Sequence, residues 1–157
     1  MRILFVVLLL AAPPPDRGSG PQKKVQSARA RVNTEADLTP EDRARMLTMA
    51  GTESRLKAWL HYIDVLKETK VWQSVVVDCS PSKPESDLLE AVLNDEVWLD
   101  LSRGQKLRTA RVLAQAWQDA NRSNQPDLDR SEVNLRNHRG VIVAGYQRGR
   151  DFFAGED

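Results

Sequence analysis

The sequence predicts an α+β fold: an antiparallel sheet of about four strands, with two or three helices packed on one face. Two stretches carry apolar residues at helical spacing, and each resulting stripe must be buried against another layer. Shorter runs are rich in β-branched and aromatic residues, which favour strands. Their order along the chain is helix, helix, strand, strand, helix, strand, strand.

The composition fits one folded domain. The chain has 157 residues, of which 41% are hydrophobic and 29% charged, and its formal net charge is +1. These values exclude a wholly disordered chain, a multi-span membrane protein and a uniformly basic nucleic-acid coat. The single cysteine excludes an internal disulfide framework and a multi-cysteine zinc site. We expect neither a metal site nor a cofactor.

The N-terminus has the outline of a secretory signal peptide. The uncharged run Ile3–Ala12 follows a basic residue and ends in small side chains, and it is too short to span a bilayer, which takes about 20 residues. We therefore expect a signal peptide over residues 1–12 and a secreted or periplasmic protein. Two alternatives stay open: an organelle transit peptide, because residues 1–34 are basic and poor in acids, or a translation start as late as Met46.

The rest of the chain divides into a linker, a domain and a tail. Residues 13–37 are rich in proline, glycine and basic residues, so a flexible linker is predicted. Apolar periodicity begins at Leu38, and a single domain is expected over residues 38–153. Residues 154–157 are predicted to be an acidic tail.

Two helices are predicted early in the domain. The first begins at Thr39-Pro40, a capping residue followed by proline, and ends at Gly51. The second covers residues 53–68. Its apolar stripe comprises Leu56, Trp59, Leu60, Ile63 and Leu66.

A third helix is predicted over about residues 103–121. Ser102 and Gln105 have the spacing of a capping box, which satisfies free amides at a helix start. The apolar face of this helix comprises Leu107, Ala110, Leu113, Ala114, Trp117 and Ala120.

The first two strands are predicted between the second and third helices. The run Val71–Cys79 is rich in branched and aromatic residues, and Pro81 and Pro84 should end it. Residues 88–93 fit both a strand and a helical face. We favour a strand because Asn94 ends the run after so few residues.

The last two strands are predicted to form a hairpin over residues 132–136 and 141–146. Apolar and polar residues alternate in the first run, and Gly140 is able to adopt the positive φ that a hairpin turn requires.

Charge is distributed unevenly along the chain. Residues 35–100 contain 7 basic and 14 acidic residues, whereas residues 101–150 contain 10 basic and 4 acidic residues. A predicted binding site lies in this basic half, on and around the hairpin, where arginines suit phosphates or an acidic partner. It comprises Arg136, His138, Arg139, Arg148 and Arg150.

Two further candidates lie outside the hairpin. Trp98 is the one tryptophan outside the predicted apolar faces and runs, so we expect it to be exposed and able to contact a ligand. Asn121-Arg122-Ser123 matches the acceptor pattern for N-glycosylation.

Two stretches match part of a known catalytic or metal-binding motif, and each lacks a feature that the motif requires. Ser80-Pro81-Ser82-Lys83 matches S-x-x-K, but Pro84 disfavours the helical turn that this motif needs. Asp127–Ser131 begins like a calcium loop, yet Glu132 stands at the glycine position and His138 at the bidentate glutamate position. No catalytic residue is predicted.

Three functional hypotheses follow. We favour a small exported binding or accessory module without chemistry of its own, whose partner is a protein or an acidic ligand. The first alternative is a polyanion or nucleic-acid binder that uses the basic hairpin; nucleic acid is disfavoured because an exported protein rarely meets it. The second is an enzyme whose site gathers scattered residues. These are His61, Cys79, Asp127 and Asp129.

Overall fold

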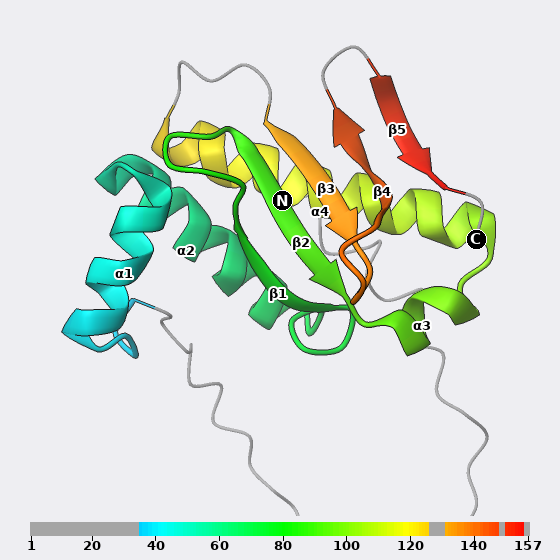
Figure 1. The fold of residues 1–157 in the computed structure, drawn as a ribbon, viewed down its shortest axis with the longest axis horizontal. Coiled ribbons are helices and arrows are strands. Elements are labelled where there is room, and N and C mark those ends of the chain that lie inside the picture. Colours follow the sequence, from blue (N-terminus) through cyan, green and yellow to red (C-terminus); the bar gives the residue numbers. More distant parts are fainter. Residues whose placement is uncertain (1–34, 126–130, 148–149, 156–157) are drawn as a thin grey trace, which may run out of the picture. The chain divides into compact units, whose positions relative to one another are not determined.

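The fold is taken from a computed structural model that describes residues 35–125, 131–147 and 150–155. The described residues form four helices and five strands (Figure 1). The helices are α1 (Pro40–Ala50), α2 (Glu53–Glu68), α3 (Asp95–Asp100) and α4 (Arg103–Asn124). The strands are β1 (Val76–Pro81), β2 (Leu88–Leu93), β3 (Glu132–Arg136), β4 (Ile142–Gln147) and β5 (Arg150–Ala154).

The predicted α+β class is confirmed, but the sheet is mixed and has five strands. The strand order is β1-β2-β3-β4-β5, and β2 and β3 are parallel while the other neighbours are antiparallel. The expectation of an antiparallel sheet of about four strands is therefore wrong in part. The connection through α3 and α4 is long enough to return the chain to the end of the sheet where β2 began, and such crossovers join parallel strands.

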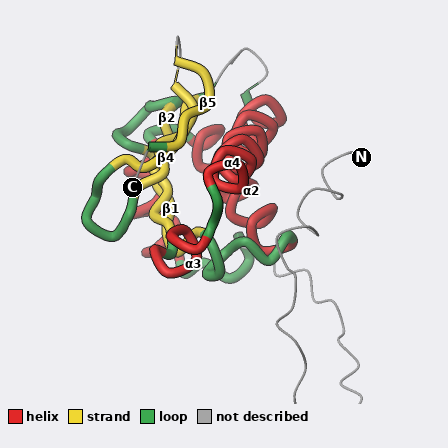
Figure 2. Tube along the Cα trace, turned by 90° about the vertical axis from the view of Figure 1, so that its right-hand side faces the viewer, coloured by secondary structure: helices red, strands yellow, loops and turns green. Residues whose placement is uncertain are grey.

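The helices gather mainly on one face of the sheet, as predicted. Figure 2 shows α2 and α4 side by side on that face. α4 contacts β3, β4 and β5, whereas α2 contacts α4 and β1, and α1 contacts α2 and β1. None of the helices that the structure describes covers the opposite face.

The predicted apolar stripes of α2 and α4 form the core. All five stripe residues of α2 are buried, and so are the α4 face residues from Ala110 to Ala120. α2 has the predicted bounds, with Thr52 as its N-cap, and α4 begins with the predicted capping box and continues to Asn124. None of the described helices is both long and apolar enough to cross a membrane.

The first strand lies later in the chain than predicted. Residues 71–75 turn instead of extending, since the amides of Val75 and Val76 both donate to the Val71 carbonyl, and β1 runs from Val76 to Pro81. Pro81 is tolerated because β1 is an edge strand, where a missing N–H costs no ladder bond.

The strand prediction for residues 88–93 is confirmed. Leu89, Ala91 and Leu93 are buried and alternate with half-buried residues. The hairpin of β3 and β4 is also confirmed. In β4, Gly145 has φ +156°, and a Cβ added there would lie 2.2 Å from the Val133 carbonyl oxygen, so the close approach of β3 and β4 requires glycine.

Two elements were not predicted. α3 begins after Asn94, whose side chain accepts from the Glu96 amide, and it buries Trp98. β5 pairs with β4 and includes Phe152, whose ring lies 4.9 Å from that of Tyr146. Ala154, which we expected to open an acidic tail, is the last residue of this strand.

Candidate functional site

The hairpin turn between β3 and β4 rests on the start of α3 and forms one candidate surface. We call its exposed side chains the tip surface. They are Glu96, Leu99 and Asp100 of α3, together with His138, Arg139, Val141 and Ile142 of the hairpin.

The turn is held by Asn137. Its Oδ1 accepts from the amides of Arg139 (3.1 Å) and Val141 (2.9 Å), and its own amide donates to the Val141 carbonyl (3.0 Å). Gly140 adopts φ +77°, the positive φ predicted for this turn. These bonds fix the backbone that presents Arg139 and Val141.

His138 fastens the turn to α3. Its amide donates to Asp95 Oδ1 (3.1 Å), and its ring Nδ1 bonds the other oxygen of the same carboxylate. The hydrogen bond from the His138 ring lowers the pKa of Asp95, with further lowering from the His138 amide and from the charge of Arg139. The Asp95 carboxylate therefore joins two elements that lie 43 positions apart in the chain.

Arg136, a predicted binding residue, is used inside the fold. It donates to Glu90 Oε1 (2.6 Å) on the neighbouring strand and to the Gly140 carbonyl (2.6 Å). About 28% of its side chain is exposed. The ion pair satisfies its charge, so Arg136 offers little to an anionic ligand.

The apolar side chains of the tip surface have no such internal role. Leu99 is 62% exposed, Val141 56% and Ile142 37%, and these are the exposed large hydrophobic residues of the part of the chain that the structure describes. Leu99 lies one helical turn beyond Asp95, on the same side of α3. The tip surface thus combines a bonded polar frame with aliphatic side chains in solvent.

The other predicted binding residues have different outcomes. Arg139 is exposed at the tip, Arg148 lies outside the described residues, and Arg150 belongs to β5 but its side chain is not described.

The expectation that Trp98 is exposed is wrong: it is 3% exposed, with Lys106 Nζ 5.8 Å from the centre of its ring. Its indole packs in the core and is not a ligand-binding surface.

Asn121 has a structural role. Its side chain is 1% exposed, and its amide nitrogen donates to the Trp117 carbonyl. A glycan cannot be accommodated on a side chain enclosed in this way, so the fold counts against glycosylation at this position.

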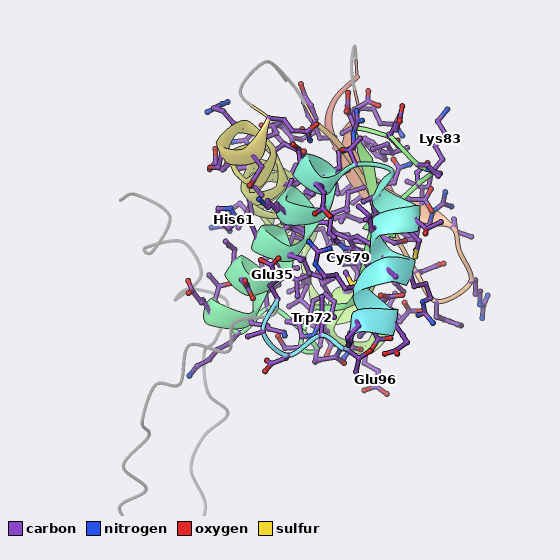
Figure 3. The ribbon with its side chains drawn as sticks, turned by 90° about the vertical axis from the view of Figure 1, so that its left-hand side faces the viewer. Glu35, His61, Trp72, Cys79, Lys83 and Glu96 are labelled. Atoms are coloured by element: carbon purple, nitrogen blue, oxygen red, sulfur yellow. The ribbon has the colours of Figure 1, made fainter. Side chains whose placement is uncertain are left out.

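The two described residues among those considered for catalysis, His61 and Cys79, do not share a site. Cys79 is buried in β1, and burial raises the pKa of its thiol to about 12, so it is protonated and unreactive. His61 is exposed on α2 (Figure 3). Asp127 and Asp129 lie outside the described residues.

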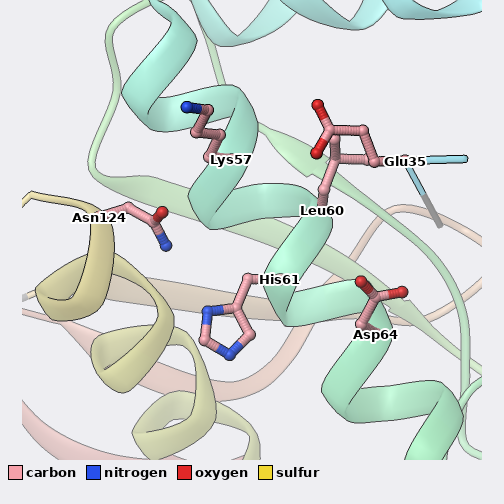
Figure 4. Close-up of a pocket in the computed structure, with 6 residues that line it drawn as sticks. All are labelled: Glu35, Lys57, Leu60, His61, Asp64 and Asn124. Atoms are coloured by element: carbon pink, nitrogen blue, oxygen red, sulfur yellow. The ribbon is translucent and has the colours of Figure 1, made fainter. Parts of the chain in front are cut away.

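His61 instead lines a shallow depression of about 240 Å³ (Figure 4). Its other lining residues are Glu35, Lys57, Leu60, Asp64 and Asn124. The depression is open and lined mainly by polar groups, and Cys79 is not part of it. It lacks the enclosed apolar walls that small-molecule sites usually have.

Comparisons with protein-family models, with curated proteins and with solved structures find no match to this chain.

Proposed function

We propose that this chain is a binding module without chemistry of its own, which contacts a protein partner through the tip surface. The observation that carries the proposal is the exposure of Leu99, Val141 and Ile142 on a hydrogen-bonded frame. Aliphatic side chains in water cost free energy, at about 25 cal/mol per Å² of apolar area left unburied. A partner that covers them recovers this free energy.

The bonded frame supports binding in a second way. Association costs entropy when loops must be ordered, and that cost is smaller where the loop is already held. Asn137 and the contact between His138 and Asp95 hold this turn before any partner arrives. The tip surface is therefore a pre-organised contact for a protein.

The polyanion alternative receives less support. Arg136, one of the predicted binding residues, pairs with Glu90, and the tip surface carries the acids Glu96 and Asp100 as well as Arg139. This mixture of charges suits a protein surface better than a chain of phosphates. Export through a signal peptide over residues 1–12 remains part of the proposal.

A photoreactive amino acid at position 141, introduced in the native host, tests this function. We expect a discrete crosslinked protein adduct, and we expect it to weaken when Leu99→Ser is added. The matched control carries the same amino acid at Lys83, which is exposed at the other end of the sheet from Glu96 (Figure 3).

The Lys83 control should give no discrete adduct. If position 141 gives none either, or if both positions crosslink alike, the tip surface is not a binding site. The mass of the same purified protein shows whether residues 1–12 have been removed.

A further inference from the structure

We propose that the contact between His138 and Asp95 is a pH-sensitive latch, which holds the β3–β4 turn to α3 more tightly when the imidazole ring is protonated. By the latch we mean this contact alone. The proposal rests on the proposed function and adds a form of regulation to it, because the latch decides how firmly part of the tip surface is held before a partner binds.

A single carboxylate links the turn to α3. Asp95 Oδ1 accepts from the His138 amide (3.1 Å), and Oδ2 bonds the ring Nδ1 of the same histidine. Among the residues that the structure describes, no other hydrogen bond joins the turn to this helix. The bonds of Asn137 to the amides of Arg139 and Val141 stay within the hairpin. The attachment of the turn to α3 therefore depends on the latch.

The charged groups around the latch keep their charge near neutral pH. Arginine and carboxylate side chains ordinarily stay charged between about pH 5.5 and 8, whereas histidine titrates in this range. Arg139 is next to the histidine and favours the ionised form of Asp95, and Glu96 is exposed on α3. Arg136 donates to a carbonyl of the turn, and its charge is paired with Glu90. Of these described groups, the imidazole ring is the one whose charge changes.

The direction of the pH effect follows from the two partners. The hydrogen bond from the His138 ring holds the pKa of Asp95 below its ordinary 3.8, so this carboxylate is charged at about pH 5.5. When the ring is protonated, an imidazolium faces the carboxylate, and charge attraction is added to the hydrogen bond. As the pH rises through the histidine range, this attraction is lost. The latch is therefore stronger at about pH 5.5 than at about pH 8.

The exposure of the two side chains limits the size of the effect. The side chain of His138 is 65% exposed and that of Asp95 is 24% exposed. Water screens ion pairs of this kind, so their charge attraction changes an equilibrium constant by only about two- to fivefold. We therefore expect the turn to loosen gradually as the pH rises, while the hairpin itself stays formed.

A double-mutant cycle on the full-length chain tests the latch. Asp95→Asn, His138→Gln and the double variant are unfolded with urea at about pH 5.5 and at about pH 8, and the cycle isolates the interaction between the two residues. Their coupling, expressed as a factor in the unfolding equilibrium constant, should be about two- to fivefold larger at the lower pH. The matched control is a cycle of Asp95→Asn with His61→Gln, the other histidine of the chain, which lies on α2. This cycle should show no coupling at either pH.

The consequence for binding is measured by photocrosslinking from position 141 in host extract, buffered at the same two pH values. The yield of the discrete adduct should be about two- to fivefold higher at about pH 5.5, since a turn that is already held costs less entropy to bind. Asp95→Asn should remove this difference, because the charge partner of the imidazolium is lost.

Equal coupling at both pH values would overturn the latch, and so would a His61 cycle with the same pH-dependent coupling. If a discrete adduct still forms at position 141, either result leaves the proposed function standing. A pH-dependent coupling of His138 with Asp95, without any adduct at position 141, supports the latch in the fold and removes the proposed function.

Discussion

The loops at the two ends of the sheet differ in how they pack against the rest of the fold. At one end, the loop of residues 82–87 between β1 and β2 packs against the helices. Asp87 forms an ion pair with Arg55 of α2 (3.0 Å), and its carbonyl accepts from the Trp117 indole of α4 (3.1 Å). The Glu85 amide donates to the Ala50 carbonyl at the end of α1 (3.1 Å). This loop is part of the packed body of the domain.

At the other end, the turn between β3 and β4 is equally well bonded, yet its apolar side chains face solvent. Val141 is 56% exposed although the amide and carbonyl of its backbone are both paired. Satisfied hydrogen bonds therefore show that the backbone of a segment is fixed in place. Burial of its apolar side chains shows that these side chains are already covered within the fold. The tip surface meets the first condition and not the second.

The largest expected effect is at the packed end. Trp117→Ala removes a buried ring that packs edge-on against Tyr62 and also removes the indole donor to Asp87. We expect a loss of about 3–5 kcal/mol in the free energy of unfolding, measured by urea denaturation. Val141→Ala at the tip should change it by less than about 0.5 kcal/mol. Equal losses in the two variants would contradict the contrast between the two ends.

A smaller effect is expected from the ion pair of the packed end. Asp87→Ala leaves Arg55, whose side chain is 19% exposed, without its carboxylate partner. We expect a loss of about 1–2 kcal/mol in the free energy of unfolding, measured in the same denaturant series. The matched control is Glu53→Ala, which breaks the more exposed pair with Arg43. A control loss as large as that of Asp87→Ala would show that burial does not strengthen the pair.

The smallest effect is expected at the tip, in the pH dependence of the Asp95 contact. Because the folded pKa of Asp95 is lowered, the contact stabilises the fold above the ordinary aspartate pKa of 3.8 and is lost as the pH falls through the folded value. An NMR titration of the Asp95 carboxyl carbon should give a midpoint below 3.8. His138→Ala should move this midpoint back toward the ordinary value, and an unchanged midpoint would disprove the contact.

Some elements could be predicted because their signals are local. The stripe of α2 recurs over about three turns, and the capping box of α4 needs only Ser102 and Gln105. The alternation of Leu89, Ala91 and Leu93 distinguished a strand from a helix once the short length of the run was considered. Each of these signals lies within one element.

Other elements could not be predicted because they depend on distant partners. α3 has six residues, too few to show a helical period, and it is held by its cap and by burial of Trp98. β5 is an edge strand that is defined by its pairing with β4. The short run around Trp98 was visible in the sequence, but its apolar residues alone did not show which would be buried.

The predicted basic site and the proposed tip surface overlap at the turn and differ in most of their residues. The turn with His138 and Arg139 was identified from its charge, whereas Leu99, Val141 and Ile142 were missed. Arg136 was interpreted as a ligand contact because Glu90, its partner, lies 46 positions away in the sequence. Exposure is a property of the whole fold, and no sequence signal marks an aliphatic side chain as exposed.

The amino-acid sequence by itself determined the α+β class, the bounds of α2, the capping of α4 and the positive φ of Gly140, because these depend on residues within a few positions of each other. Only the tertiary structure decided the parallel pairing of β2 with β3, the burial of Trp98 and the exposure of the tip surface. These depend on which elements meet after the long connection through α4. Their free energies come from contacts between residues far apart in the chain.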